Sequence, residues 1–179
     1  MRGPQVVVVA PHGAGKSTLS DVLHCQNLVL DTDNVCDILG LPAELSVEDE
    51  MRVLNLCLAS RPPLLVTNLT RFDDYRDCHI LMYKWKDVHE AQRILFSSRG
   101  VWVPASWLQS WSVEAVELHS RLASRLYSHN IVSEIKTVSG HDFISMLMKD
   151  LKGVLNEETL CFLNRAYHTA VQRGDLKLR

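Results

Sequence analysis

Apolar runs alternate with amphipathic stretches along the chain, and this alternation predicts its secondary structure. The first run, residues 6–10, consists of four valines and an alanine, which is typical of a central parallel strand buried on both faces. Further strands are predicted at 27–31, 64–67, 78–83 and 131–138. Helical periodicity predicts helices at 16–24, 33–39, 46–60, 87–98, 113–128, 140–151 and 156–173, a helical turn at 72–77 and an irregular segment at 99–112.

Strands separated by helices imply right-handed crossovers, so we expect a three-layer α/β fold. It would contain a parallel sheet of about five strands with helices on both faces. A length of 179 residues with 46% hydrophobic residues suits a single core. We expect residues 1–152 to form the main domain and residues 153–179 to form an extra C-terminal helical extension packed on it. Ligands of such sheets bind at the carboxyl ends of strands.

The segment between the first strand and the first helix, residues 10–17, reads Ala-Pro-His-Gly-Ala-Gly-Lys-Ser. Strand, glycine-containing loop, Lys-Ser and helix form the context of a phosphate-binding P-loop. Glycines let backbone N–H groups turn toward phosphate oxygens, the lysine reaches the terminal phosphates, and the serine hydroxyl can ligate Mg²⁺. Ala10 replaces the motif's first glycine, so we expect an altered loop entry. The predicted nucleotide-binding residues are His12, Gly13, Ala14, Gly15, Lys16, Ser17 and Thr18.

Two carboxylates, Asp31 and Asp33, follow the second predicted strand. Asp31 is the candidate for the Mg²⁺ site, together with Ser17. Asp33 lies further out of the sheet and is the candidate to position or deprotonate an attacking hydroxyl. The alternative is that one of the two caps the helix that follows.

The order of strand, P-loop, helix and a strand ending in Leu-Asp-Thr-Asp resembles the P-loop small-molecule and nucleoside or nucleotide kinases, shikimate and gluconate kinases in particular. The resemblance continues through Met82 and Tyr83, a helix carrying Arg93 and the Arg-Leu-Tyr of residues 125–127, so it covers roughly residues 5–152. It implies a P-loop kinase fold with ATP as donor and Mg²⁺ as cofactor. It also implies that Arg125 contacts the acceptor.

The identity of the acceptor does not transfer with this resemblance. Residues 67–70 read Thr-Asn-Leu-Thr where shikimate kinases carry a Gly-Gly-Gly element, and the lid lacks the family's Arg-Pro pair. Polynucleotide 5′-kinases likewise place an aspartate after the second strand. That keeps nucleic acid open as an acceptor, although the low net basicity gives it no support.

Arginines are the candidates for stabilising the charge of a transferring phosphoryl group. Arg99 precedes Gly100, where a lid hinge would lie, and Arg93 is the second candidate. Arg71 and Arg76 flank the third strand and could hold an acidic acceptor. For each of these arginines the alternative is a solvated surface charge.

Three tryptophans, Trp102, Trp107 and Trp111, make the predicted lid unusually apolar. They could fold back on the core, form a stacking pocket for a base or ring of the acceptor, or dock another protein. The C-terminal helix is a second candidate surface for a protein partner. The side chain of His12 could approach a phosphate or point to solvent.

Composition and charge argue against several other classes of protein. A net charge of −2 argues against a protein-wide field for nucleic acid or membranes, although a local basic groove stays open. No apolar run approaches the roughly 18 residues of a membrane span, and the N-terminus does not resemble a signal peptide. The five cysteines are dispersed without a C-x-x-C pair, which favours reduced thiols in a cytoplasmic protein.

The leading hypothesis is therefore an ATP-dependent, Mg²⁺-requiring kinase of a small molecule, nucleoside or nucleotide. The second hypothesis is a nucleotide-binding, kinase-like module of a larger assembly, with weak or no kinase activity. A motor-type NTPase is less favoured, because Thr67 and Asn68 stand where the third strand of such proteins ends in acidic residues.

Overall fold

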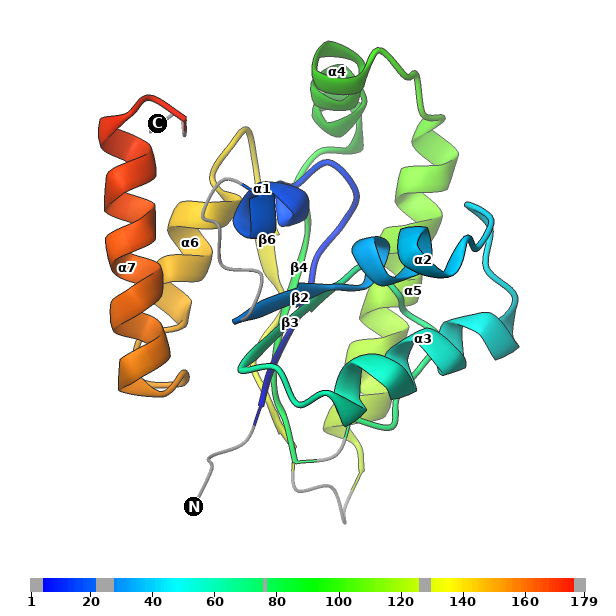
Figure 1. Ribbon diagram of the computed structural model, residues 1–179. Coiled ribbons are helices and arrows are strands. Elements are labelled where there is room, and N and C mark those ends of the chain that lie inside the picture. The colour runs from blue at the N-terminus through cyan, green and yellow to red at the C-terminus, as the bar shows by residue number, and fades with distance from the viewer. Residues whose placement is uncertain (1–4, 22–27, 76, 126–129, 176–179) are drawn as a thin grey trace.

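A parallel β-sheet with helices on both faces forms the centre of the computed structural model, which describes residues 5–21, 28–75, 77–125 and 130–175 (Figure 1). The strand order is β2-β3-β1-β4-β5, and β6 also pairs with β4. The strands are β1 (Val6–Val9), β2 (Val29–Asp31), β3 (Leu64–Thr67), β4 (His79–Trp85), β5 (Ile131–Val132) and β6 (Lys136–Val138). The helices are α1 (Lys16–Asp21), α2 (Thr32–Leu39), α3 (Val47–Ala59), α4 (Val88–Arg99), α5 (Ala105–Ala123), α6 (Phe143–Asp150) and α7 (Glu157–Gln172).

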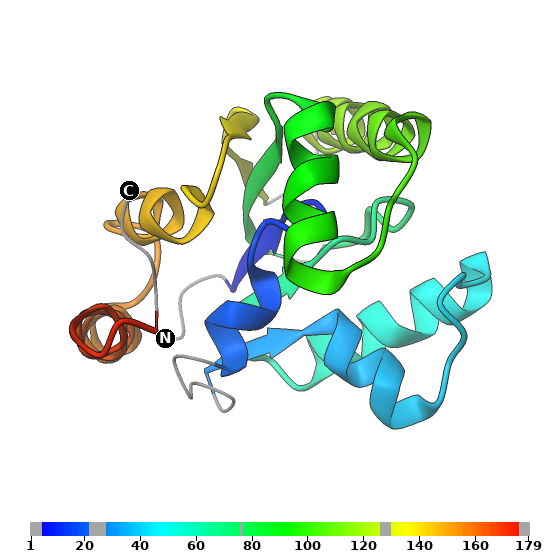
Figure 2. The same ribbon diagram turned by 90° about the horizontal axis from the view of Figure 1, so that it is seen from above.

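Alternation along β1 divides the hydrophobic core into two layers. Val6 and Val8 contribute to the core on the side of α1, α6 and α7, whereas Val7 and Val9 contribute to the core beneath α3 and α5. Successive strand residues point to opposite faces, so a run of four valines supplies both layers at once. The predicted three-layer α/β fold is confirmed, and Figure 2 shows the helices on either side of the sheet from above.

The C-terminal helix α7 contributes to the first of these core layers. Its residues Leu163 and Ala170 are buried within it, and Leu155 precedes the helix in the same cluster. Figure 1 shows α7 beside α6 at the outer edge of this layer. Asn156 caps α7, because its side-chain oxygen accepts from the backbone N–H of Thr159.

Most predicted elements are present with ends shifted by a few residues, and three predictions were wrong. The helical turn at 72–77 is absent from 72–75, which contain no helix. The segment 99–112 is not irregular throughout, because α5 begins at Ala105 after Pro104, whose φ of −58° suits a helix start. The predicted strand at 131–138 is two short strands, β5 and β6, separated by residues 133–135.

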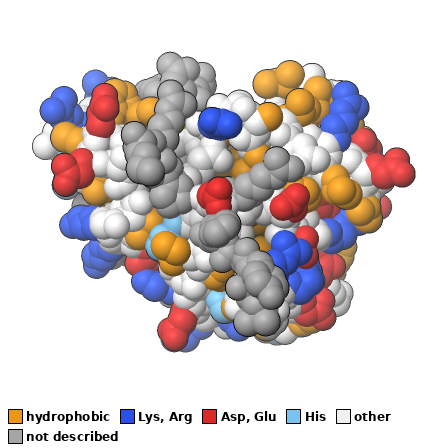
Figure 3. Space-filling model, turned by 90° about the horizontal axis from the view of Figure 1, so that it is seen from below, with side chains coloured by type: hydrophobic (Ala, Val, Ile, Leu, Met, Phe, Trp, Pro, Cys, Tyr) orange, Lys and Arg blue, Asp and Glu red, His pale blue; other side chains and the backbone are white. Residues whose placement is uncertain are grey.

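The surface carries charges of both signs. Figure 3 shows the molecule from below, the end at which β1 begins, with acidic and basic side chains intermixed. This distribution matches the near-neutral net charge. In the described part of the chain, none of the helices is both long and apolar enough to cross a bilayer.

Candidate functional site

The loop that joins β1 to α1 has the backbone of a phosphate cradle. Gly13 has a φ of +79° and Gly15 has a φ of +117°, and residues other than glycine rarely adopt such backbone angles. At Gly13 there is also no room, because an added Cβ would lie 2.7 Å from Cδ2 of Leu95 on α4. Both glycines predicted from the motif are therefore required by conformation, and Gly13 is required by space as well.

Ala10 fits the loop entry without strain. In the described part of the chain, the non-glycine residues with positive φ are Arg61 and Asp77, so Ala10 keeps an ordinary conformation. Its backbone N–H donates to the carbonyl of Thr67 at 2.9 Å, which extends the pairing of β1 with β3. The motif's first glycine is thus dispensable here, since this position continues the strand.

Lys16 lies at the centre of the loop as the first residue of α1. Its side chain is only 5% exposed, and Nζ donates to the carbonyl of Pro11 at 2.8 Å. Burial lowers the pKa of Lys16 to about 8, and the positive charge of Arg99 lowers it slightly further. The Asp33 and Asp31 carboxylates act in the opposite direction. Asp31, Asp33 and Arg99 therefore each lie within electrostatic reach of the Lys16 ammonium.

Asp31, the last residue of β2, and Asp33, in the first turn of α2, divide the roles suggested for the two aspartates. Asp31 is 1% exposed, and its Oδ1 accepts from the backbone N–H of Asp33 at 3.0 Å, so it caps α2. Asp33 lies in the first turn of that helix and is exposed. Between them, the Thr32 and Thr67 hydroxyls bond at 2.9 Å and join the ends of β2 and β3. The capping alternative is correct for Asp31, whereas Asp33 presents its carboxylate to solvent.

The remaining P-loop residues follow the motif. Ala14 is buried in the core and Thr18 is half-buried on α1. Ser17 is the second residue of α1, but its side chain lies outside the described part of the structure.

The two lid arginines lie on the same helix but differ in their electrostatic effect. Arg99 is the last residue of α4, and Gly100 caps that helix with a φ of +66°. The Arg99 guanidinium contributes to the lowered pKa of both Lys16 and His12, so its charge acts on the phosphate loop. Arg93 is exposed on α4 and is not among the groups that shift these two pKa values.

Two of the arginines predicted to contact the acceptor, Arg71 and Arg125, are engaged by carboxylates. Arg71 Nε donates to Oε2 of the buried Glu50 at 2.6 Å, and the Arg71 backbone N–H donates to Oε1. Arg125 Nη2 lies 2.8 Å from Oδ2 of Asp73. Arg76 lies outside the described residues.

Sequence reasoning missed an aromatic cluster beside the loop, formed by His12, Asn68, Trp107 and Trp111. Asn68 follows β3 and donates from Nδ2 to the imidazole of His12, with 2.7 Å to Nε2. Trp111 Nε1 donates to the Asn68 carbonyl at 2.8 Å, and the Trp107 ring lies parallel to that of His12 within 19°. His12 does not point freely to solvent. A polar residue at the carboxyl end of β3 was the one signal that could have revealed this cluster.

Burial lowers the pKa of His12 to about 4, and the charges of Lys16 and Arg99 act in the same direction against that of Asp33. The imidazole is therefore neutral at physiological pH and can accept the Asn68 hydrogen bond. In addition, Trp85 Nε1 donates to the His12 carbonyl at 3.1 Å. The loop backbone and the His12 ring are thus both held by neighbouring side chains.

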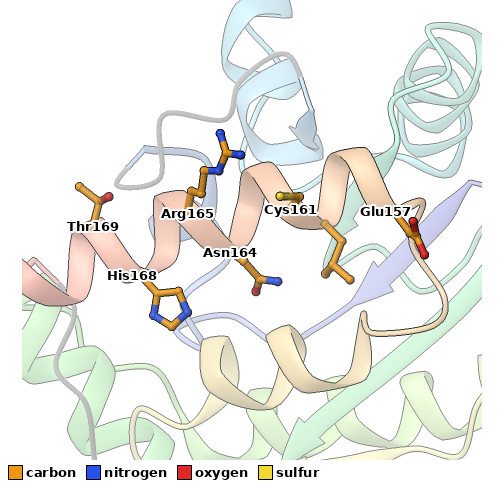
Figure 4. Close-up of a pocket in the computed structure, with 7 residues that line it drawn as sticks. Glu157, Cys161, Asn164, Arg165, His168 and Thr169 are labelled. Carbon is orange, nitrogen blue, oxygen red and sulfur yellow. The ribbon is translucent and has the colours of Figure 1, made fainter.

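Two hollows lie away from this loop. One, of about 590 Å³, is lined among the described residues only by α7, as Figure 4 shows: Glu157, Leu160, Cys161, Asn164, Arg165, His168 and Thr169. The other, of about 360 Å³, lies between the end of β4, the start of α4, α5 and β6. Neither is lined by the P-loop, by Asp31 or by Asp33.

Comparison with solved structures identifies proteins of similar fold. A shikimate kinase from Acinetobacter baumannii, solved in complex with shikimate, is 19% identical with a TM-score of 0.53, covering 86% of this chain and 96% of its own. A gluconokinase from Sinorhizobium meliloti 1021 is 20% identical with a TM-score of 0.44, and the match covers 96% of this chain and 99% of the gluconokinase. No protein-family model and no curated protein sequence matches the chain. The chain thus has the fold of P-loop kinases.

Proposed function

We propose that this protein is an ATP-dependent kinase that phosphorylates a small molecule, a nucleoside or a nucleotide. The observation that carries the proposal is the grouping of Lys16, Asp31, Asp33 and Arg99 around a loop with two positive-φ glycines. A P-loop alone would suit many nucleotide-binding proteins. An exposed carboxylate and an arginine beside it match the parts that phosphoryl transfer needs.

The donor half of the site consists of the loop and the start of α1. Backbone N–H groups of the loop would hold the phosphates at a helix N-terminus, and Lys16 would exchange its bond to the Pro11 carbonyl for phosphate oxygens. Asp31 and Ser17 would hold Mg²⁺, which needs only one or two protein ligands when phosphates supply others. The fit rests on Asp31, whose carboxylate is buried at the end of β2 within electrostatic reach of Lys16. Bound Mg²⁺ would neutralise charge on the phosphate oxygens.

The acceptor half begins at Asp33. Its exposed carboxylate would accept the proton of the attacking hydroxyl, and Arg99 would stabilise charge on the transferring group. Arg99 is preferred to Arg93 for this role, because its charge contributes to the lowered pKa of both Lys16 and His12 and that of Arg93 is not among the causes.

The test measures ATP consumption by the purified chain with Mg²⁺ and a panel of nucleosides, nucleotides and hydroxy acids. Turnover should depend on an acceptor, and Lys16→Ala should abolish it. Asp33→Asn should lower turnover by about 10²-fold or more while ATP still binds. Asp37→Asn is the matched control, since Asp37 is an exposed carboxylate one turn later on α2. Equal turnover in the Asp33 and Asp37 variants would contradict the assigned role of Asp33.

A second candidate function is a nucleotide-binding module within a larger assembly. It is favoured by two exposed aromatic side chains, Phe96 in the last turn of α4 and Trp102 between α4 and α5. They are 55% and 59% exposed, and their ring centroids lie 6.0 Å apart. ATP binding without acceptor-dependent turnover, together with a stably co-purifying partner, would support this function. Acceptor-dependent turnover by a monodisperse monomer would contradict it.

A further inference from the structure

Trp107 presents an open indole surface directly beside the phosphate loop. Trp107 and Trp111 are four residues apart on α5, so their side chains lie on the same face of the helix. Trp111 fixes the direction of that face, because its Nε1 donates to the Asn68 carbonyl at the carboxyl end of β3. Trp107 therefore points toward the edge of the sheet where ligands bind.

The environment of Trp107 differs on its two sides. Its ring centroid lies 6.5 Å from that of His12 with the planes 19° apart, so one side faces the loop. The side chain is nevertheless 58% exposed. A large, exposed aromatic surface next to a phosphate site is suited to stacking on a planar ring.

The charges around the site disfavour an acidic acceptor. Arg71, one of the two arginines predicted to hold an acidic acceptor, is bound to Glu50, and Arg125, which the resemblance places at the acceptor, is bound to Asp73. Asp33 adds an exposed negative charge on the acceptor side. A carboxylate or phosphate on the acceptor would meet this charge, whereas an uncharged molecule would not.

We infer that the acceptor is a nucleoside-type compound, whose uncharged planar heterocycle stacks on Trp107 while a sugar hydroxyl approaches Asp33. This inference rests on the proposed kinase function. In the transfer, the hydroxyl oxygen forms a bond to the γ-phosphorus and the bond from that phosphorus to the β–γ bridging oxygen breaks. ADP leaves and the hydroxyl proton passes to Asp33. A free nucleoside and the 5′-hydroxyl end of an oligonucleotide both present this chemistry.

The binding test needs no turnover. The full chain with Mg·ADP is titrated with the four common ribonucleosides and with a short 5′-hydroxyl oligonucleotide. Shikimate and gluconate, hydroxy acids without an aromatic ring, are titrated for comparison. Binding is followed by intrinsic tryptophan fluorescence. At least one nucleoside or the oligonucleotide should bind, and Trp107→Ala should raise its Kd about 10-fold or more. Trp107→Phe keeps a stacking ring and should restore most of the affinity.

Trp102→Ala is the matched control, because Trp102 is equally exposed but contacts Phe96 rather than the loop. It should change the Kd less than twofold. Equal losses in the Trp107 and Trp102 variants would overturn the inference, as would tight binding of a hydroxy acid that neither substitution affects. Binding of the oligonucleotide but no free nucleoside would assign the ring to a nucleic-acid end.

The two proposals fail in different ways. Nucleoside binding that depends on Trp107, without any phosphorylation, would leave the stacking site standing and remove the kinase function. Phosphorylation of a hydroxy acid with unchanged kinetics in Trp107→Ala would leave the kinase function standing and remove the nucleoside inference.

Discussion

Replacing Lys16 with methionine should make the nucleotide-free protein more stable while abolishing its proposed activity. The ammonium is buried, and burial lowers its pKa from the ordinary 10.5 to about 8. At about 1.4 kcal/mol for each pKa unit, that difference corresponds to roughly 3 kcal/mol of destabilisation. Loss of the bond to Pro11 offsets about 1 kcal/mol of the gain, so a net stabilisation of roughly 2 kcal/mol is expected.

The pH dependence of this effect has a definite sign. Below pH 8 Lys16 is protonated in both the folded and the unfolded chain, so the full destabilisation is present at pH 7. Between about pH 8 and 10.5 the unfolded chain binds more protons than the folded protein, so wild-type stability rises with pH. The advantage of Lys16→Met should therefore shrink across this window.

Urea denaturation followed by circular dichroism, without nucleotide, measures both effects at pH 7 and pH 10. For a chain of this length, roughly 2 kcal/mol corresponds to about 4–8 °C in Tm. Lys152→Met is the control, because Lys152 is exposed and its removal should leave stability nearly constant at both pH values. A Lys16→Met variant less stable than wild type at pH 7, or an advantage equally large at pH 10, would refute the reasoning.

Four further predictions concern the loop and the core. Gly13→Ala should lower the free energy of unfolding by about 2 kcal/mol or more in urea denaturation, whereas Gly40→Ala, also at positive φ but with open space around it, should lose only about 1 kcal/mol. Tyr75→Phe should be neutral or raise Tm slightly, because the buried Tyr75 hydroxyl has no hydrogen-bond partner among the described residues. Tyr83→Phe should instead lower Tm, since the Tyr83 hydroxyl donates to a carboxylate at 2.6 Å. The wild-type free energy of unfolding should fall as the pH is lowered from 6.5 to 4, because His12 binds a proton in the unfolded chain but not in the folded protein. In His12→Gln this decrease should be smaller, as measured by denaturation at a series of pH values.

The conformational features of the candidate site that sequence predicted correctly are local in the chain. The valine run, the glycines with positive φ and the lysine at the start of α1 all lie within residues 6–16. Asp31 and Asp33 are likewise specified by a strand end and the next helix start. In each case conformation and spacing are decided by neighbouring residues, so a motif suffices.

The parts that sequence did not predict depend on contacts between distant residues. The hydrogen bond between Asn68 and His12 joins residues 56 positions apart, and no periodicity encodes it. The carboxylate that binds Arg71 lies 21 positions away, so an arginine available for an acceptor could not be told from one engaged in an ion pair. The start of α5 was missed because Gly100 and Pro104 suggested an irregular segment, whereas Pro104 directly precedes the first residue of the helix.

The strands at the two sides of the sheet are short. On one side the edge strand is β2 (Val29–Asp31). On the other side two separate strands, β5 (Ile131–Val132) and β6 (Lys136–Val138), pair with successive parts of β4. An unpaired strand edge is a template on which another chain can add a strand, and short or interrupted edges restrict such growth. The break that divided the predicted last strand into two therefore also limits edge-to-edge aggregation between copies of the protein.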